Sequence, residues 1–320
     1  MTLCLGQAQS VIQNIMKKLK IIYLGNFENP FSDATEKHIK YAFEMLGHEV
    51  IPINEQDFTE EDILKIKDPD MFLFHKGGTG FGFSMDKLIN LLCYLTCKKV
   101  FWYFDRAIYV GLPIREDRTR FVENLARYSD YGFMTDDTWI RRHKYTNLYP
   151  LMQGIGNEDV SLGKYRKEFD HDIVFTGSIY PPRDRFVELL ISRYGNRFKA
   201  YNDVFGRDLY DLCASAKIIV APMYPSDDFH WSSRIYMILG SGGFLVHPDL
   251  YGLRKHFTEG KHFVGYTNAQ ELIETIDYFL DPKHEEQRKA IQMEGWKHCI
   301  NNHTYLHRVK EMLDIVYGSK

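Results

Sequence analysis

Short apolar runs alternate with amphipathic segments from about residue 20 onward. In the first half, the apolar runs predict strands over residues 21–24, 50–53, 71–75, 100–104, 132–135 and 147–151, and the amphipathic spacing predicts helices over 35–46, 60–66, 85–94 and 119–128. Strands that are apolar on both faces are typical of a parallel sheet covered by helices on both sides. The first half is therefore predicted to form a doubly wound, Rossmann-like α/β domain.

A second alternation of the same kind follows a polar, glycine-containing stretch at 154–164. It predicts strands over 172–176, 198–201, 218–221, 244–246 and 262–265, and helices over 183–194, 209–216, 233–240, 250–257, 269–280 and 285–300. We expect domains at 1–153 and 154–302, with a final helical segment, 303–320, crossing back onto the first domain. Because open α/β sheets bind ligands beyond the carboxyl ends of their strands, two such domains predict a cleft between them.

The amino-acid composition excludes few classes of protein. The 320 residues are 44% hydrophobic and 26% charged, as in ordinary globular proteins. The net charge of -3 disfavours a broad nucleic-acid-binding surface, although it is compatible with a local basic groove. The five cysteines are odd in number and lie mostly in apolar runs, which predicts core thiols in a reducing, cytoplasmic setting.

The first 20 residues carry apolar side chains at near-helical spacing. No apolar run in the chain approaches the ~20 residues of a membrane span. The segment also lacks the basic start and unbroken apolar block of a secretory signal. We interpret it as an amphipathic docking helix, with peripheral membrane contact as the alternative.

The stretch 232–246 carries the clearest chemistry. Ser232 and Ser233 precede a short predicted helix, and serine is a favoured helix cap. A capped helix start offers free N–H groups to an anion. Arg234, in the first turn, has the wrong sign for the helix dipole, which suggests a ligand as negative as a diphosphate. The alternative is an ordinary helix whose arginine faces water.

A second strand-end loop points to the same ligand. Gly177 follows the strand predicted over 172–176 and permits close backbone approach, with Ser178 and Tyr180 beside it. Arg183, near the start of the next helix, presents a guanidinium that fits phosphate oxygens. Arg183 and Arg234 are therefore predicted to be two cations at one phosphate site.

The amino-terminal half has two loops that could line the cleft. Gly25 and Asn26 follow the first strand, and a glycine-dense loop after the third includes Lys76, Gly77 and Gly78. This loop lacks the ending of a nucleotide P-loop, and an exposed flexible loop is the alternative. His75 and Asp105 are candidates to orient an acceptor hydroxyl or take its proton, although each is as well suited to a structural role.

Ordered fragments of the second half resemble group 1 glycosyltransferases, which are retaining enzymes of the GT-B fold, and most of all the spore-maturation-type branch. The matching pieces are residues 174–178 with Arg183, then 216–220, 233–236, 242–246 and 303–308. Together they span about half of the chain in the family's order. The first half matches only in pattern, through Asn26 and residues 102–105.

The resemblance implies a GT-B fold and a hexosyl- or pentosyltransferase that uses a nucleotide diphosphate sugar. Arg183, Ser233 and Arg234 would hold the diphosphate, and the first domain would hold a glycan, lipid, protein or small-molecule acceptor. Fixed cations stabilise the charge that develops on the departing phosphate, so no metal and no other cofactor is expected. The sugar would develop oxocarbenium character, and the family implies retention at the anomeric carbon.

The chain departs from the family at two positions. Members of the family usually carry two glutamates where this sequence has Phe229 and Met237. Asp227, Asp228, His230 and Trp231 lie near the first position and are candidates for sugar contacts. Three alternatives stay open: a nucleotide-sugar or partner-binding protein without turnover, a nucleic-acid base glycosyltransferase, and a sugar epimerase on the same two-domain plan.

Overall fold

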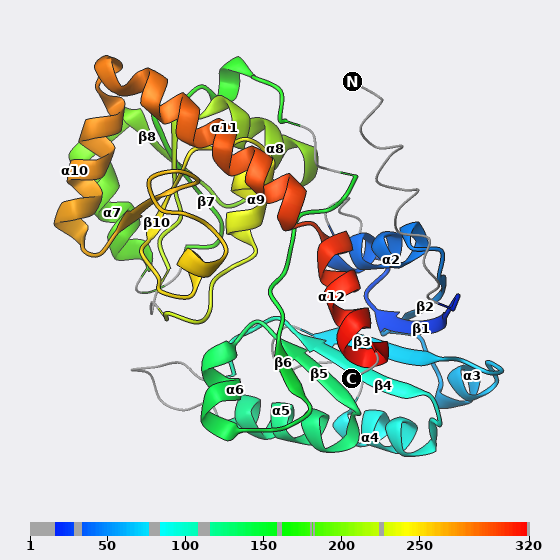
Figure 1. The fold of residues 1–320 in the computed structure, drawn as a ribbon. Helices are drawn as coiled ribbons and strands as arrows, with labels where there is room; N and C mark the ends of the chain where they lie inside the picture. Colours follow the sequence, from blue (N-terminus) through cyan, green and yellow to red (C-terminus); the bar gives the residue numbers. More distant parts are fainter. Residues whose placement is uncertain are drawn as a thin grey trace.

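The computed structural model describes residues 17–28, 34–76, 84–107, 116–158, 162–179, 181, 183–223 and 227–318. They form two α/β domains, each built on its own parallel sheet, as the alternating pattern predicts (Figure 1). The amphipathic helix predicted before residue 20 lies outside the described residues up to residue 16. Among the described helices, none is both long enough and apolar enough to cross a membrane.

The amino-terminal sheet has six parallel strands in the order β2-β1-β3-β4-β5-β6. Their bounds are β1 Lys20–Gly25, β2 Glu49–Asn54, β3 Met71–Lys76, β4 Lys98–Tyr103, β5 Tyr131–Met134 and β6 Leu148–Pro150. The order reverses between β1 and β3, which places a topological switch point, the usual ligand site of such sheets, at the carboxyl ends of these two strands.

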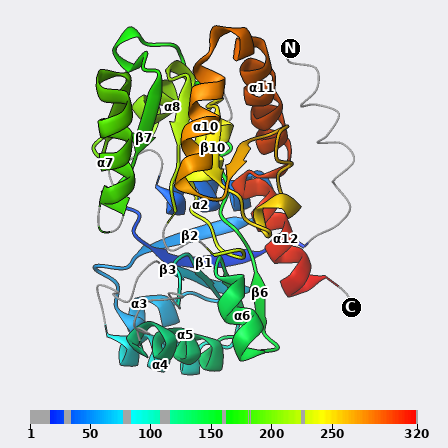
Figure 2. The same cartoon turned by 90° about the vertical axis from the view of Figure 1, so that its left-hand side faces the viewer.

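Helices cover both faces of this sheet. One face packs against α2 (Thr35–Met45) and α12 (Tyr305–Tyr317). The other packs against α3 (Glu60–Leu64), α4 (Met85–Tyr94), α5 (Glu116–Tyr128) and α6 (Asp137–His143). Because α12 follows the whole second domain in sequence, its place beside α2 confirms the predicted return of the chain (Figure 2).

The carboxyl-terminal sheet has five parallel strands in the order β11-β10-β9-β7-β8. The strands are β7 Ile173–Thr176, β8 Phe198–Tyr201, β9 Ile218–Val220, β10 Leu245–Pro248 and β11 Val264–Tyr266. The helices are α7 Arg183–Tyr194, α8 Gly206–Ser215, α9 Arg234–Gly240, α10 Ala269–Leu280 and α11 Glu285–Asn302. One apolar cluster joins α8, α9 and α11 to the sheet, and another joins α7 and α10 to its opposite face.

Two elements differ from the sequence prediction. The helix predicted over 250–257 is reduced to the 3-10 turn Leu253–Lys255. In contrast, α6 was not predicted, because it is short and charged and buries only Trp139 among its seven residues. Its start is fixed locally: the side chain of Asp136 accepts a hydrogen bond from the backbone N–H of Trp139, 3.0 Å away.

The cysteines also correct one expectation. Cys213 and Cys299 are buried thiols, as predicted, and burial raises the pKa of each to about 12. Cys93 is exposed, although it lies in an apolar run. The face of α4 that packs inward is formed by Leu88, Leu91 and Leu92, and Cys93 falls outside it.

The chain crosses between the domains twice, and the two crossings are hydrogen-bonded to each other. The N–H of Ile155 donates to the carbonyl of His303, and the N–H of Tyr305 donates to the carbonyl of Ile155, each at 3.0 Å. Gly154 permits this approach, because a Cβ there would lie 2.8 Å from the His303 carbonyl oxygen. The domain boundaries at 153 and 302 stay predictions, although both lie at these crossings.

Four histidines gather beside the second crossing: His256, His262, His298 and His303. The rings of His262 and His298 stack at 4.1 Å, and the Nε2 atoms of His298 and His303 lie 3.3 Å apart. Burial lowers the pKa of His256 and His262 to about 4 and that of His303 to about 2, with neighbouring cations, Arg308 among them, adding to the effect. His256, His262 and His303 are therefore uncharged at neutral pH.

We expect the free energy of unfolding to fall between pH 7 and pH 5. In the unfolded chain these histidines have a pKa of about 6.5 and take up protons there, whereas in the folded protein they take up protons only at lower pH. Their contribution to the free energy of unfolding is therefore complete above pH 6.5 and is lost as the pH falls toward 4. Each histidine with a folded pKa near 4 contributes a loss of about 2 kcal/mol at pH 5. Urea unfolding at both pH values measures it. The variant His262→Asn should reduce the difference, whereas His284→Asn, outside the cluster, should leave it unchanged.

Candidate functional site

The carboxyl ends of the two sheets face each other, and the turn 227–230 joins them. This turn follows β9 of the second domain and lies against the segment that follows β5 of the first. His230 Nδ1 donates to the carbonyl of Thr135 at 3.0 Å, and the N–H of Asp137 donates to the carbonyl of Phe229 at 3.3 Å. The turn 227–230 of the second domain and the segment after β5 of the first therefore form one junction between the domains.

Asp227 holds this junction together. Its Oδ2 accepts from Arg106 Nη2 and its Oδ1 accepts from Thr138 Oγ1, both at 2.6 Å and both across the domain boundary. The ion pair is buried, with side-chain exposures of 4% for Asp227 and 6% for Arg106. Asp227 is thus engaged in the junction, and the sugar contact suggested for it from the sequence stays a prediction.

Arg183 and Arg234 come together at the carboxyl end of β7. Their guanidinium carbons lie 5.9 and 5.6 Å from the centre of the same ring, that of Phe175. Arg183 is 8% exposed and donates through Nη1 to the carbonyl of Ser178 at 2.8 Å. Two helices that start 51 residues apart thus present their first residues at one strand end. The phosphate site assigned to these arginines from the sequence stays a prediction.

The backbone conformation and small size of Gly177 make room for Arg234. Its φ of +125° is a backbone conformation that other residues rarely adopt, and a Cβ there would lie 2.1 Å from Arg234 Nη2. The guanidinium of Arg234 therefore occupies the space that a side chain at position 177 would need. The close backbone approach that the sequence assigned to a ligand is made here by this arginine.

We expect Gly177→Ala to weaken anion binding more than it lowers stability. The strained φ costs about 1–3 kcal/mol, whereas the methyl group forces the flexible guanidinium of Arg234 to move. Gly195→Ala is the matched control, since Gly195 also has a positive φ, +52°, but nothing lies within 4 Å of a Cβ there. Titration with pyrophosphate and urea unfolding separate the two effects. Equal pyrophosphate affinities in both variants would contradict this account.

The predicted serine cap is present, but on the earlier residue. The Oγ of Ser232 accepts from the N–H of Arg234 at 3.3 Å, whereas Ser233 occupies the N-cap position with helical φ and ψ and makes no side-chain cap bond. The cap predicted for this pair of serines is therefore made by Ser232. The hydroxyl of Ser233 stays a candidate ligand contact.

Two titratable groups near Arg234, the side chains of His247 and Cys213, are both uncharged at pH 7. Burial, reinforced by Arg234, lowers the pKa of His247 on β10 to about 4, so this imidazole is neutral at pH 7. The raised pKa of Cys213 keeps its thiol protonated. His247 is held by a hydrogen bond from Nδ1 to the Pro248 carbonyl at 2.8 Å.

His75 belongs to a buried network at the switch point of the first sheet. Its Nδ1 bonds to the hydroxyl of Tyr23 at 2.9 Å, and its Nε2 lies 3.2 Å from Oε1 of Glu36. Burial acts to raise the pKa of Glu36, but hydrogen bonds and the charge of His75 outweigh it and lower the value. Both ring nitrogens of His75 are thus engaged by the protein, and its catalytic role stays a prediction.

The other predicted residues of the first domain lie around this network. Gly25 packs over Glu36 and His75, and the N–H of Asn26 donates to Glu36 at 3.2 Å. Asp105 lies on the loop after β4, 3.9 Å from Arg118 Nη1. Lys76 ends β3, and only its backbone is described. Gly77, Gly78 and Tyr180 lie outside the described residues.

A cavity of about 230 Å³ adjoins the junction on the side of the two crossings. The second domain contributes Phe229 and Trp231 to its walls. Trp231 is buried and donates through Nε1 to the hydroxyl of Tyr236 at 3.0 Å. Asp228 lies on the surface, where its Oδ1 accepts from the N–H of Tyr251 at 3.1 Å, so it is not directed at this cavity.

The space beside Met237 is much smaller. Met237 and Ser233 line a second cavity of about 30 Å³, together with Gly154–Gly156 of the first crossing and the start of α2. That volume is enough for about one water molecule. The side of α9 that carries Met237 is therefore nearly filled. The described residues contain no group of three or more histidine, cysteine or acidic side chains that could hold a metal ion.

Comparison with known proteins agrees with the fold. Residues 164–314 match a family model described as glycosyl transferase-like. HepE from Anabaena, solved with UDP and glucose, is 12% identical, with a TM-score of 0.64 over 94% of this chain and 100% of that chain. Sucrose-phosphate synthase from Thermosynechococcus elongatus is 10% identical, with a TM-score of 0.66 over 94% and 100%. A search of curated proteins found no match.

A glycosyltransferase from Rickettsia africae is 12% identical, with a TM-score of 0.61 over 95% of this chain and 100% of that chain. These likenesses establish the class of fold: two Rossmann-like domains in the GT-B arrangement, as predicted from the sequence. The family match covers the second domain and the returning helix, where the resemblance in sequence also lies.

Proposed function

We propose that this protein is a glycosyltransferase that moves a sugar from a nucleoside diphosphate sugar to an acceptor held between its two domains. The observation that carries the proposal is the pair Arg183 and Arg234 at the carboxyl end of β7, beside Gly177. The GT-B fold and the glycosyl transferase-like match of the second domain support the same class. UDP, present with glucose in the HepE structure, is the first donor nucleotide to test.

In the proposed reaction the two guanidinium groups bind the diphosphate of the donor. The bond between the anomeric carbon and the phosphate oxygen breaks, and its electron pair stays on that oxygen. Because the negative charge there grows as the bond breaks, fixed cations stabilise the transition state more than the bound donor. An acceptor oxygen bonds to the anomeric carbon and loses its proton. We propose that the departing phosphate takes this proton, that the configuration is retained, and that no metal takes part.

The first domain supplies the remaining proposed roles. Asp105 is the candidate to orient the acceptor, since its carboxylate is half-exposed on the loop after β4. His75 acts, in this proposal, through Glu36 and Asn26, which it fixes at the end of β1. A cytoplasmic location and a hexose or pentose as the transferred sugar are part of the same proposal.

A thermal-shift screen with nucleoside diphosphates and their sugars tests the proposal. A ligand that binds only the folded protein at 100 times its dissociation constant stabilises it by about 2.7 kcal/mol. We expect at least one nucleoside diphosphate to raise the melting temperature, with and without EDTA, and we expect Arg183→Met to abolish the shift. No shift from any nucleotide, or an undiminished shift in the variant, would refute the proposed donor site.

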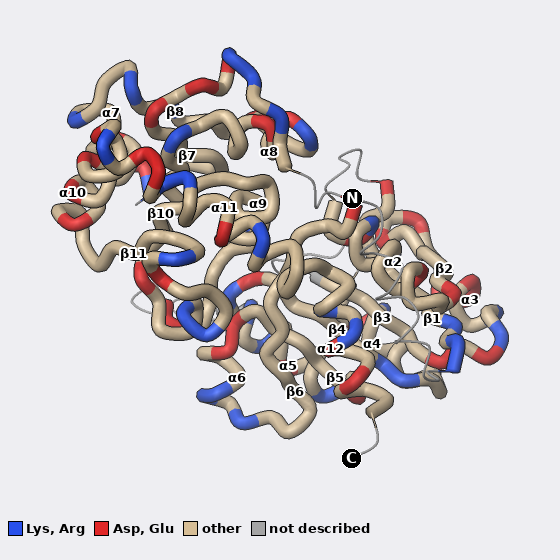
Figure 3. The backbone as a smooth tube through the Cα atoms, turned by 45° about the horizontal axis from the view of Figure 1, so that its top comes forward, with Lys and Arg blue, Asp and Glu red and all other residues tan. Residues whose placement is uncertain are grey.

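A nucleotide-sugar-binding protein without turnover is the second candidate. Phe229 and Met237 replace two carboxylates of the family, and the cavity beside Met237 is nearly filled. Such a protein would pass the thermal-shift screen but would never release free nucleotide from a bound donor. The nucleic-acid alternative is weaker, because basic and acidic residues are interspersed over both domains (Figure 3).

A further inference from the structure

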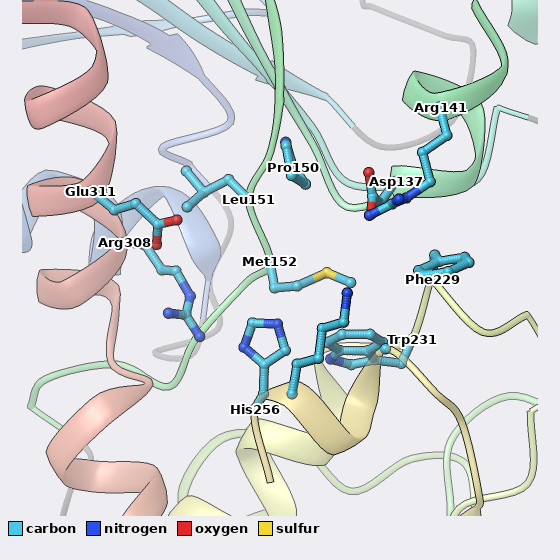
Figure 4. A pocket seen from close by; sticks show the side chains of 12 residues that line it. Asp137, Arg141, Pro150, Leu151, Met152, Phe229, Trp231, His256, Arg308 and Glu311 are labelled. Atoms are coloured by element: carbon cyan, nitrogen blue, oxygen red, sulfur yellow. The ribbon is translucent and has the colours of Figure 1, made fainter. Parts of the chain in front are cut away.

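The cavity of about 230 Å³ beside the two crossings combines aromatic walls with several polar groups (Figure 4). Phe229 and Trp231 come from the turn that precedes α9, and Met152 comes from the first crossing. Arg308 reaches the cavity from α12, and Lys255 and His256 reach it from the loop after β10. Parts of both domains and of both crossings thus surround one space.

Three polar side chains around this cavity have no hydrogen bond or ion pair with any other described residue. They are the ammonium group of Lys255, the imidazole of His256 and the carboxylate of Glu311. Lys255 lies over the rings of Phe229 and Tyr251, at 5.8 and 5.1 Å from their centres. Convergent polar groups in a partly apolar hollow are the usual mark of a binding site.

The remaining charges around the cavity are already paired or bonded. Arg141 forms an ion pair with Asp137 at 2.7 Å and packs over the ring of Phe229 at 4.5 Å. Arg308 donates to the carbonyl of Gln153 at 3.0 Å and through Nη2 to His303 at 2.7 Å. A ligand therefore meets one free cation, one free carboxylate and one neutral imidazole among the described lining residues.

This set of groups selects a ligand that both donates and accepts hydrogen bonds. A hydroxyl group does both, so a polyhydroxyl ring can accept from Lys255 and donate to Glu311. The imidazole of His256 is neutral and offers one donor and one acceptor to such a ring. A phosphate would gain Lys255 but would be repelled by Glu311 and would leave the aromatic walls unused. The volume is below the ~300–1,000 Å³ of sites for drug-sized ligands, so it fits a single ring rather than an oligosaccharide.

We propose that this cavity binds one pyranose ring and is the subsite for a sugar unit of the acceptor. The assignment to the acceptor rests on the proposed glycosyltransferase function, whereas the binding of a sugar does not. The acceptor is then a saccharide or a glycoside, and Phe229 contributes to a sugar platform at the position where the family carries a glutamate.

Ligand-observed saturation-transfer NMR on the full chain, without nucleotide, tests the subsite. The probes are the methyl pyranosides of glucose, galactose, mannose and N-acetylglucosamine, with inorganic phosphate as a competitor. We expect at least one pyranoside to bind and phosphate not to displace it. Lys255→Met and Glu311→Gln should each weaken binding about tenfold or more, because each removes a charged hydrogen bond. Lys261→Met and Glu294→Gln, on the surface away from the cavity, should change nothing.

The Glu311→Gln variant separates a sugar from an anion. Removing the carboxylate weakens the binding of a ligand that donates a hydroxyl group to it, but it strengthens the binding of an anion. The subsite is refuted if no pyranoside binds, if phosphate displaces the bound sugar, or if Glu311→Gln binds more tightly. A protein that binds a pyranoside but no nucleotide would keep the subsite and lose the proposed function. A protein that binds a nucleotide but no pyranoside would refute the subsite and leave the proposed function unaffected.

Discussion

Replacing Arg234 by alanine is expected to slow sugar transfer by about 10²–10³-fold, the cost of removing one preorganised donor to a developing charge. The guanidinium of Arg234 lies against Gly177 and 5.6 Å from the centre of the Phe175 ring, at the carboxyl end of β7 where the diphosphate is proposed to bind. The loss should appear in kcat and in kcat/KM alike, since the interaction strengthens as the phosphate departs. Release of nucleotide from the donor that stabilises the protein measures it.

Two further variants make this result specific. Arg234→Lys should recover part of the rate, because lysine keeps the charge but loses the planar fork that matches a phosphate. Arg193→Ala is the matched control: Arg193 is an exposed arginine on α7 that pairs with Asp277 at 2.9 Å, away from the strand ends. Transfer in Arg234→Ala as fast as in Arg193→Ala would remove Arg234 from the mechanism.

Replacing Asp227 by alanine should lower the free energy of unfolding by about 3–5 kcal/mol, because it removes the buried carboxylate partner of Arg106. Asp227 also accepts hydrogen bonds from Thr138 and from the N–H of Phe229, so the turn that carries Phe229 should lose its fixed position as well. Urea unfolding measures the first effect, and small-angle scattering measures any opening of the two domains.

The matched control for this variant is Asp228→Ala. Asp228 is the neighbouring carboxylate, but it lies on the surface, where it accepts a hydrogen bond from the N–H of Tyr251. We therefore expect a change of about 1 kcal/mol or less. The double variant Arg106→Met with Asp227→Leu should recover much of the lost stability, since apolar residues can replace a buried pair. Similar stabilities for Asp227→Ala and Asp228→Ala would show that the buried pair does not hold the domains together.

The strands and most helices are predictable from the sequence, because the side of each element that is buried sets the spacing of apolar residues along that short segment. Residues 71–74, within the strand predicted over 71–75, are apolar at every position, and a parallel strand covered on both faces requires this. The exceptions have local causes. Helix α6 is not predicted because its seven residues bury only one side chain, that of Trp139, and therefore carry no clear apolar period. The helix predicted over 250–257 forms only one 3-10 turn at Leu253–Lys255.

Part of the candidate site was also predictable. Gly177, Arg183 and Arg234 follow strand ends in one domain, and parallel strands bring their carboxyl ends to one edge of a sheet. The contact of Arg234 with Gly177 and the shared ring of Phe175 were not predictable, because they depend on side-chain directions across 59 residues of chain. Asp227 was proposed from its sequence neighbours for sugar contacts, and the structure pairs it with Arg106 of the other domain.

The sequence by itself determined two parallel sheets, their covering helices, the returning helix and the strand ends at which the arginines stand. These features follow from the order of apolar and polar residues, which acts over short distances. Only the tertiary structure decided how the two sheets face each other, which carboxylate joins them, and that Lys255, His256 and Glu311 surround one cavity with Phe229 and Trp231. Such contacts join residues far apart in the sequence, 121 positions for Arg106 and Asp227, and no local pattern records which distant side chain will fill a given space.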